Sequence, residues 1–76
     1  MDMKGYTMLD PHCMTDNQRL ICNFGRKMME MAATESNDTI SNAFARVGEH
    51  LAEKASFKGL TALDHDIIRF AKARDV

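Results

Sequence analysis

The fold is decided by the stretch from Thr39 to Ala55, TISNAFARVGEHLAEKA. At about 100° per residue, an α-helix here places two apolar lines side by side. The first line carries bulky side chains, those of Ile40, Phe44, Val47 and Leu51. The second line carries small residues: Ala45, Gly48, Ala52 and Ala55. A surface helix needs only one stripe to face a core. The wider apolar arc therefore predicts a helix that lies between two neighbours, one of which can approach its backbone closely.

An earlier helix is predicted before this stretch. Thr15 and Gln18 have the spacing of a capping box, in which each side chain satisfies a backbone N–H of the other residue. From Leu20 to Ala32, apolar residues recur at three- and four-residue steps, and Met29 and Cys22 fall off this stripe. Gly25 costs about 1 kcal/mol relative to Ala inside a helix. Because the stripe continues in phase beyond Gly25, we expect one unbroken helix.

A third helix is predicted after a connection that contains Phe57, which we expect to fold over the end of the core. Thr61 and Asp64 repeat the capping signal with Asp in place of Glu. The expected core face of this helix holds Leu63, Ile67, Phe70 and Ala71, with Ile68 beside it.

These patterns predict an all-α fold, a small three-helix bundle with an N-terminal arm. We place the arm at residues 1–14, the helical domain at 15–76, and the helices near 15–34, 38–55 and 61–74. A chain of 76 residues hides only about 60–65% of the surface that its unfolded form exposes. We therefore predict a homodimer, with Ala45, Gly48 and Ala52 as helix-packing or dimer contacts.

The charge balance disfavours some classes of partner. Ten Lys and Arg residues against eleven Asp and Glu give a net charge of -1, without the positive excess that phosphate binding uses. No apolar run reaches the roughly 18 residues of a membrane span. The first ten residues include Asp2 and Lys4 and have no apolar signal region. We expect a cytoplasmic protein with reduced cysteines and no membrane contact, for which nucleic acid is a possible but disfavoured partner.

Reactive residues are present but not grouped. The possible zinc ligands are His12, Cys13, Cys22, His50 and His65, and they include no CxxC or HxxxH pair. Asp64, His65 and Asp66 are adjacent, so on a helix their side chains diverge by about 100° per residue. We therefore expect no metal, no cofactor and no enzyme activity.

A protein-interaction module fits this absence of convergent chemistry. We predict an adaptor or inhibitor that regulates a larger protein or complex, as small phage- and plasmid-borne regulators do by analogy. The expected partner-binding positions are Arg26, Met29 and Glu30 on the first helix and Arg69 and Lys72 on the third.

The alternative is a DNA-binding transcriptional regulator of the helix-turn-helix type. Three short helices are its minimal architecture, and Arg19, Asn23 and Arg26 form one polar line while Arg69, Lys72 and Arg74 form another. The connection from Ala55 to Thr61 is longer than the usual three- or four-residue turn. Together with the net charge, this length favours the protein partner.

Overall fold

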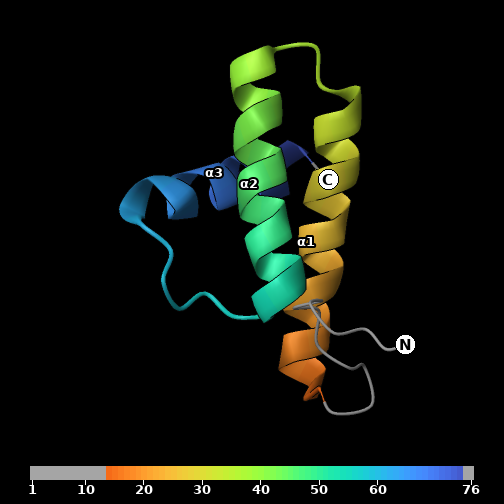
Figure 1. The fold of residues 1–76 in the computed structure, drawn as a ribbon, viewed down its shortest axis with the longest axis vertical. Coiled ribbons are helices and arrows are strands. Elements are labelled where there is room, and N and C mark those ends of the chain that lie inside the picture. Colours follow the sequence, from red (N-terminus) through yellow and green to blue (C-terminus); the bar gives the residue numbers. More distant parts are fainter. Residues whose placement is uncertain (1–13, 75–76) are drawn as a thin grey trace, which may run out of the picture.

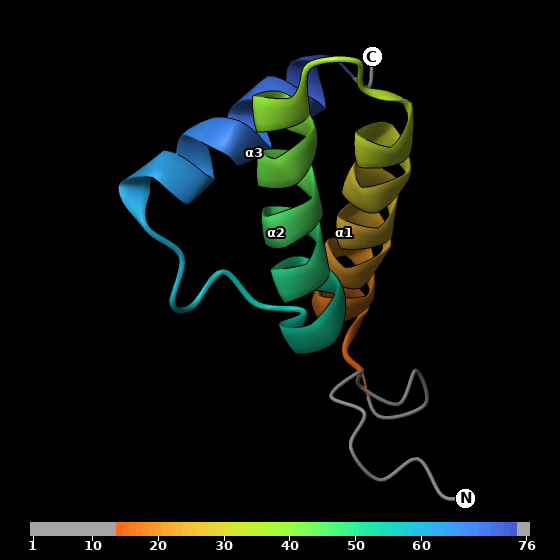
Figure 2. The same cartoon turned by 45° about the horizontal axis from the view of Figure 1, so that its top comes forward.

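A computed structural model describes residues 14–74, which form three α-helices and no strand (Figure 1). The helices are α1, Asp16–Thr34, α2, Asp38–Lys54, and α3, Ala62–Arg74. Helices α1 and α2 form an antiparallel hairpin, and α3 crosses behind α2 (Figures 1 and 2). The all-helical prediction is confirmed, and each helix bound lies within one residue of its predicted position. The predicted arm falls outside the described residues except for Met14.

Side-chain caps explain where the helices begin. Thr15 and Gln18 form the predicted capping box: the Thr15 N–H donates to Gln18 Oε1 at 2.9 Å, and the Gln18 N–H donates to Thr15 Oγ1 at 3.1 Å. Thr61 and Asp64 repeat this exchange before α3, at 3.0 and 3.1 Å. Asn37 caps α2, because its Oδ1 accepts the Ile40 N–H at 3.1 Å.

Two glycines bring α1 and α2 into close contact. A Cβ atom built on Gly25 would lie 2.6 Å from both the Ala52 nitrogen and the Gly48 carbonyl oxygen. A Cβ atom on Gly48 would lie 2.7 Å from the Gly25 carbonyl oxygen. Since only glycine fits at either position, the small apolar line of α2 packs against α1 within the same chain. Gly48 and Ala52 are buried in this contact, whereas Ala45 is exposed.

Cys22 and Met29 fall off the predicted stripe of α1, yet both side chains contact α2. Cys22 is buried, and its thiol lies 3.4 Å from the Ala52 carbonyl oxygen, to which it donates. Met29 is half-buried, with its Cγ beside Gly48. Both residues face α2 because they lie on the side of α1 that carries Gly25, where α1 and α2 approach closely. The apolar surface of α1 is thus wider than its Leu20–Ala32 stripe.

The core lies where α2 meets both of its neighbours. Its fully buried side chains are Phe44, Met28, Leu51 and Val47. Ile68 and Ala71 of α3 close this core from the other side of α2. Helix α2 therefore contacts a helix on each side, as the two apolar lines between Thr39 and Ala55 predict.

The predicted core face of α3 is confirmed in part: Ala71 is buried and Ile67 packs against the core, but the face is rotated toward Ile68. Ile68 is buried, whereas Leu63 is 62% exposed and Phe70 is also exposed. The first turn of α3, which carries Leu63, projects beyond the edge of the hairpin (Figure 1). Asp64, in the same turn, reaches back to Arg46 of α2 at 3.4 Å.

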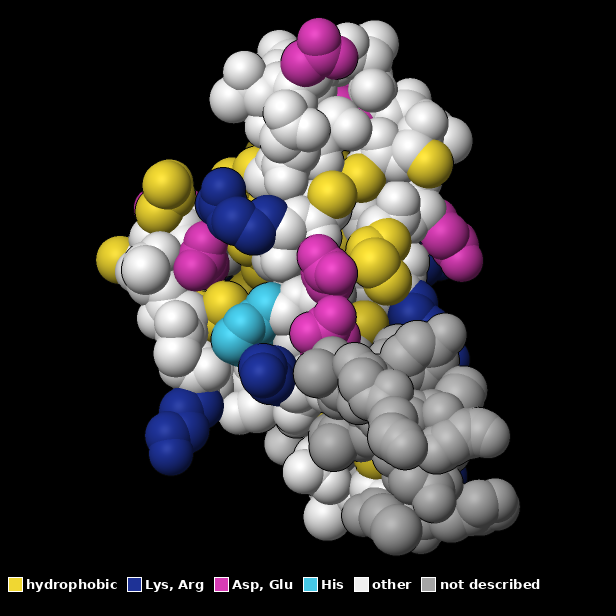
Figure 3. All heavy atoms as spheres, in the orientation of Figure 1, with side chains coloured by type: hydrophobic (Ala, Val, Ile, Leu, Met, Phe, Trp, Pro, Cys, Tyr) yellow, Lys and Arg dark blue, Asp and Glu magenta, His cyan; other side chains and the backbone are white. Residues whose placement is uncertain are grey.

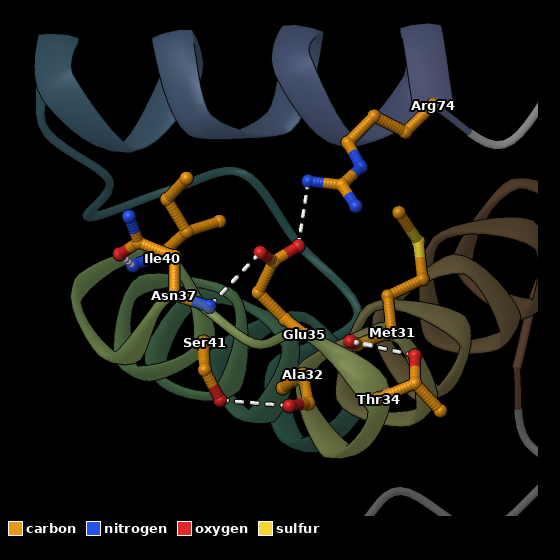
Figure 4. Close-up of polar contacts among 8 residues, drawn as sticks. All are labelled: Met31, Ala32, Thr34, Glu35, Asn37, Ile40, Ser41 and Arg74. Atoms are coloured by element: carbon orange, nitrogen blue, oxygen red, sulfur yellow. Dashed lines mark hydrogen bonds and ion pairs between the residues drawn. The ribbon is translucent and has the colours of Figure 1, made fainter.

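The last turn of α3 is fixed by Arg74 (Figure 4). Its Nη1 lies 2.6 Å from Oε1 of Glu35, whose side chain is only 8% exposed. The other Glu35 oxygen, Oε2, accepts the Asn37 N–H at 3.1 Å. The guanidinium also lies 5.7 and 5.5 Å from the ring centroids of Phe44 and Phe70. Arg74 therefore joins the end of α3 to the connection between α1 and α2.

Candidate protein-docking groove

An apolar groove runs between α1, the α2–α3 connection and α3. Its volume is about 290 Å³, and its lining residues are Asn17, Leu20, Ile21, Phe24, Phe57 and Lys72. Four of these six side chains are large and apolar. We refer to this site below as the groove.

Each wall of the groove follows from local structure. Asn17, Leu20, Ile21 and Phe24 recur at steps of one, three and four residues, so they share one side of the first two turns of α1. Helix α2 ends at Ala55, whose φ of 47° is left-handed and redirects the chain toward Phe57.

Two contacts hold the connection that carries Phe57. His50 Nε2 lies 3.2 Å from the Lys58 carbonyl oxygen, and the Leu60 N–H donates to the Phe57 carbonyl at 3.2 Å. The Phe57 ring also packs on the His65 ring of α3, with 6.1 Å between ring centroids. Phe57 is thereby held beside α1 and does not cover the core as predicted.

The groove leaves large apolar side chains in contact with water. Leu20 is 68% exposed and Phe57 is 41% exposed, while Phe24 is half-buried beside them. A single exposed leucine is ordinary, but adjacent Leu and Phe side chains in a concave site are typical of surfaces that bind other molecules. Covering them with a partner removes apolar area from water, which is the main favourable term in association.

One charge lies at the edge of this apolar surface. The Lys72 Nζ lies 5.6 Å from the Phe24 ring centroid. Among the described residues 14–74, Lys72 is the one charged lining residue, and it forms no ion pair with any of them. The groove therefore offers an apolar floor with an unpaired ammonium group at the α3 end.

The adjacent acidic residues of α3 go to separate partners. Asp66 pairs with Arg69, while Asp64 accepts the Thr61 N–H and pairs with Arg46. The Thr61 N–H, with smaller effects of the Thr61 side chain and Arg46, holds the pKa of Asp64 below its ordinary 3.8 although partial burial opposes the shift. Within the described part of the chain, no three His, Cys, Asp or Glu side chains are placed to hold a metal ion.

Of the five predicted partner-binding residues, the groove includes only Lys72. Arg26 and Glu30 are exposed on α1, and Arg69 is exposed on α3. Met29 was expected on the surface, but its contact with Gly48 covers part of it. Figure 3 shows the hairpin face turned away from α3, where acidic, basic and apolar side chains alternate over the described residues without a continuous apolar patch.

The two basic lines of the DNA-binding alternative lie in different settings. Arg19, Asn23 and Arg26 line a second, smaller hollow of about 170 Å³ on α1, together with Met14 and Cys22. The basic residues of α3 make intramolecular contacts: Arg69 with Asp66, Lys72 with Phe24, and Arg74 with Glu35.

Sequence reasoning missed the groove because Leu20 and Phe24 fit the core stripe of α1. Their exposure depends on how far α3 extends over that helix, which periodicity does not encode. The one available signal was Phe57, a large aromatic residue in a connection.

Comparison with known proteins adds no further constraint: no family model, curated protein or solved structure matches the chain. No helix in residues 14–74 is long and apolar enough to cross a membrane.

Proposed function

We propose that the chain is a non-enzymatic protein-interaction module, an adaptor or inhibitor that regulates a larger protein, and that it docks through the groove. The observation that carries the proposal is the exposure of Leu20 and Phe57 in one concave apolar site. Such sites bind partner side chains because anchoring residues gain most when they fill a pocket that excludes water.

Affinity capture with matched variants tests the proposal. The baits are the full chain, Leu20→Glu, and Leu63→Glu as a control. Leu63 suits this purpose because it is a helical leucine of similar exposure, 62% against 68%, and lies outside the groove. All six lining residues come from one chain, so the control keeps a complete groove in any oligomeric state.

We expect one stoichiometric protein on the wild-type and Leu63→Glu baits, and a loss of at least about tenfold on Leu20→Glu, the effect of truncating an interface anchor. Circular dichroism should show three folded baits, since both substitutions are on the surface. Equal recovery on all three baits contradicts docking in the groove. Duplex DNA bound with a steep salt dependence would instead favour the transcriptional regulator.

We also propose a surface for the predicted homodimer. The small apolar line of α2 is occupied by α1, so a second copy has to use other apolar groups. Leu63 and Phe70 lie seven residues apart on one side of α3, and both are exposed. Two such convex helix sides can pack antiparallel around a twofold axis, whereas two concave grooves cannot fill each other.

A further inference from the structure

We infer that the groove binds an amphipathic helix of the partner, with two apolar side chains in the groove and a carboxylate at Lys72. This inference rests on the proposed function and adds the chemistry of the occupant. It has three parts: the secondary structure of the occupant, the charge it carries, and the end of the groove at which that charge lies.

The dimensions of the groove favour side chains of a helix. Its volume of about 290 Å³ is just below the range of small-molecule sites, about 300–1,000 Å³. Its wall on α1 runs from Asn17 to Phe24, two helical turns or about 10 Å. A helix presents apolar residues at i and i+3 or i+4 over such a distance. A peptide that binds by strand addition needs a sheet edge, and residues 14–74 contain no strand.

The charges around the groove favour an acidic occupant. Lys72 is the one charged residue in the lining, and its ammonium group has no carboxylate partner among the described residues. Lys58 is next to Phe57 in the chain, and the ring of His65 packs on Phe57. Asp64 and Asp66, the acidic neighbours of His65, are paired with Arg46 and Arg69. A carboxylate near Lys72 gains an attraction that apolar side chains alone do not supply.

The same charges set the direction of the occupant. Asp16 precedes Asn17 at the start of α1, whereas Lys72 lies over Phe24, two turns further along. A carboxylate at the Phe24 end lies near this ammonium group, whereas the described lining residues offer no basic group at the Asn17 end. We therefore place the acidic residue of the occupant about one turn from its apolar pair, on the Lys72 side.

A peptide selection tests this chemistry without knowledge of the natural partner. Random 16-residue peptides displayed on phage are selected on the immobilised full chain, and one selected peptide is remade with each acidic residue changed to Lys. Fluorescence polarisation then measures both peptides on the wild type, on Lys72→Glu and on Leu20→Glu. Arg69→Glu is the control, since it makes the same charge change on α3 outside the groove.

We expect peptides with Leu, Phe or Met at helical spacing and Asp or Glu one turn away. Lys72→Glu should weaken the acidic peptide about tenfold and restore the Lys peptide to within about threefold of the original affinity, as expected for a contact between two charges. Arg69→Glu should change either affinity by less than about threefold, because its charge lies outside the site. The swap in preference is a readout that a purely structural role of Lys72 would not produce.

The failures of the two proposals are distinguishable. If the peptides need Leu20 but show no charge preference, the proposed carboxylate at Lys72 is wrong and the groove remains the docking site. Peptides indifferent to Leu20→Glu overturn both proposals. A proline-rich consensus, a consensus with alternating spacing, or a selection that returns no binders overturns the helical occupant.

Discussion

Gly25 and Gly48 show how single residues set the distance between α1 and α2. From the sequence alone, Gly25 is expected to destabilise its helix by about 1 kcal/mol relative to Ala. The structure shows the compensating contact, because backbone atoms of α2 occupy the space that a Cβ atom would take. Periodicity identifies the small line on α2, but it does not show that the facing surface of α1 also needs a glycine.

We predict that Gly25→Ala destabilises the fold by about 1–3 kcal/mol, although Ala is the better helix former. The added Cβ would meet backbone atoms at 2.6 Å, which cannot move aside without separating the helices. Urea unfolding followed by circular dichroism measures the effect. Asn42→Ala, at an exposed position of α2, is the control and should stabilise by a few tenths of a kcal/mol, about the difference in propensity. If both substitutions stabilise the chain, the close approach is absent.

Asp64 gives a prediction on acid stability. Its pKa is lowered in the folded state, mainly by the Thr61 N–H, so the ionised carboxylate stabilises the fold above the ordinary pKa of 3.8. This contribution is lost as the pH falls through the lowered pKa. At pH 7, Asp64→Asn should therefore be less stable than the wild type by about 0.5–1 kcal/mol, the scale of one cap. The urea midpoints of the wild type and Asp64→Asn should differ at pH 7 and converge near pH 2. A difference between the two proteins that does not depend on pH contradicts this role of Asp64.

At the scale of the helix, α3 adds a polar contact at each end to the core packing of Ile68 and Ala71. Its first turn pairs Asp64 with Arg46, and its last turn carries Arg74 to Glu35, Phe44 and Phe70. Capping residues and dipole-compatible charges in the sequence were sufficient to predict where α3 begins and ends. They did not predict its rotation, because Leu63 and Ile68 are equally apolar and the choice depends on how far α2 extends beneath them.

We predict that Arg74→Met destabilises the chain by about 2 kcal/mol, because it leaves the nearly buried Glu35 carboxylate without its cation. The estimate is below that for a fully buried pair because the Arg74 side chain is 43% exposed. Arg69→Met removes an exposed pair with Asp66 and should cost less than about 0.5 kcal/mol. Urea unfolding compares the two variants. Equal effects would show that Arg74 contributes no more than a surface ion pair.

Adding Glu35→Gln should recover part of the loss in Arg74→Met. A neutral amide can still accept the Asn37 N–H through its oxygen, but it places no unpaired charge beside α3. A double-mutant cycle over the two positions therefore isolates their coupling. No recovery would indicate that Arg74 acts through its contacts with Phe44 and Phe70 rather than through Glu35.

At the scale of the whole molecule, the sequence predicted the helices and the central position of α2 but not the groove. The groove combines Leu20 of α1, Phe57 of a connection and Lys72 of α3, which are far apart in the sequence. In the sequence, Leu20 belongs to a core stripe, Phe57 follows a helix end, and Lys72 is a predicted partner-binding position with no link to the other two. Only the crossing of α3 over the hairpin brings the three residues together, and that crossing depends on tertiary packing.

The same reasoning moves the predicted homodimer to another surface. Gly48 and Ala52 are already buried by α1, so Ala45→Glu, at the exposed member of that line, should not change the sedimentation of the chain. Leu63→Glu should weaken the dimer by about tenfold or more, because an isologous contact along α3 places the new charge in the interface of both copies. Leu20→Glu should leave the dimer unchanged, since the concave groove takes a different occupant. Sedimentation velocity over a concentration series compares the variants. If Ala45→Glu dissociates the dimer, the interface lies on α2 and not on α3. If the wild type is a monomer at every concentration, the dimer proposal is wrong, but the groove, which is complete within one chain, can still bind its partner.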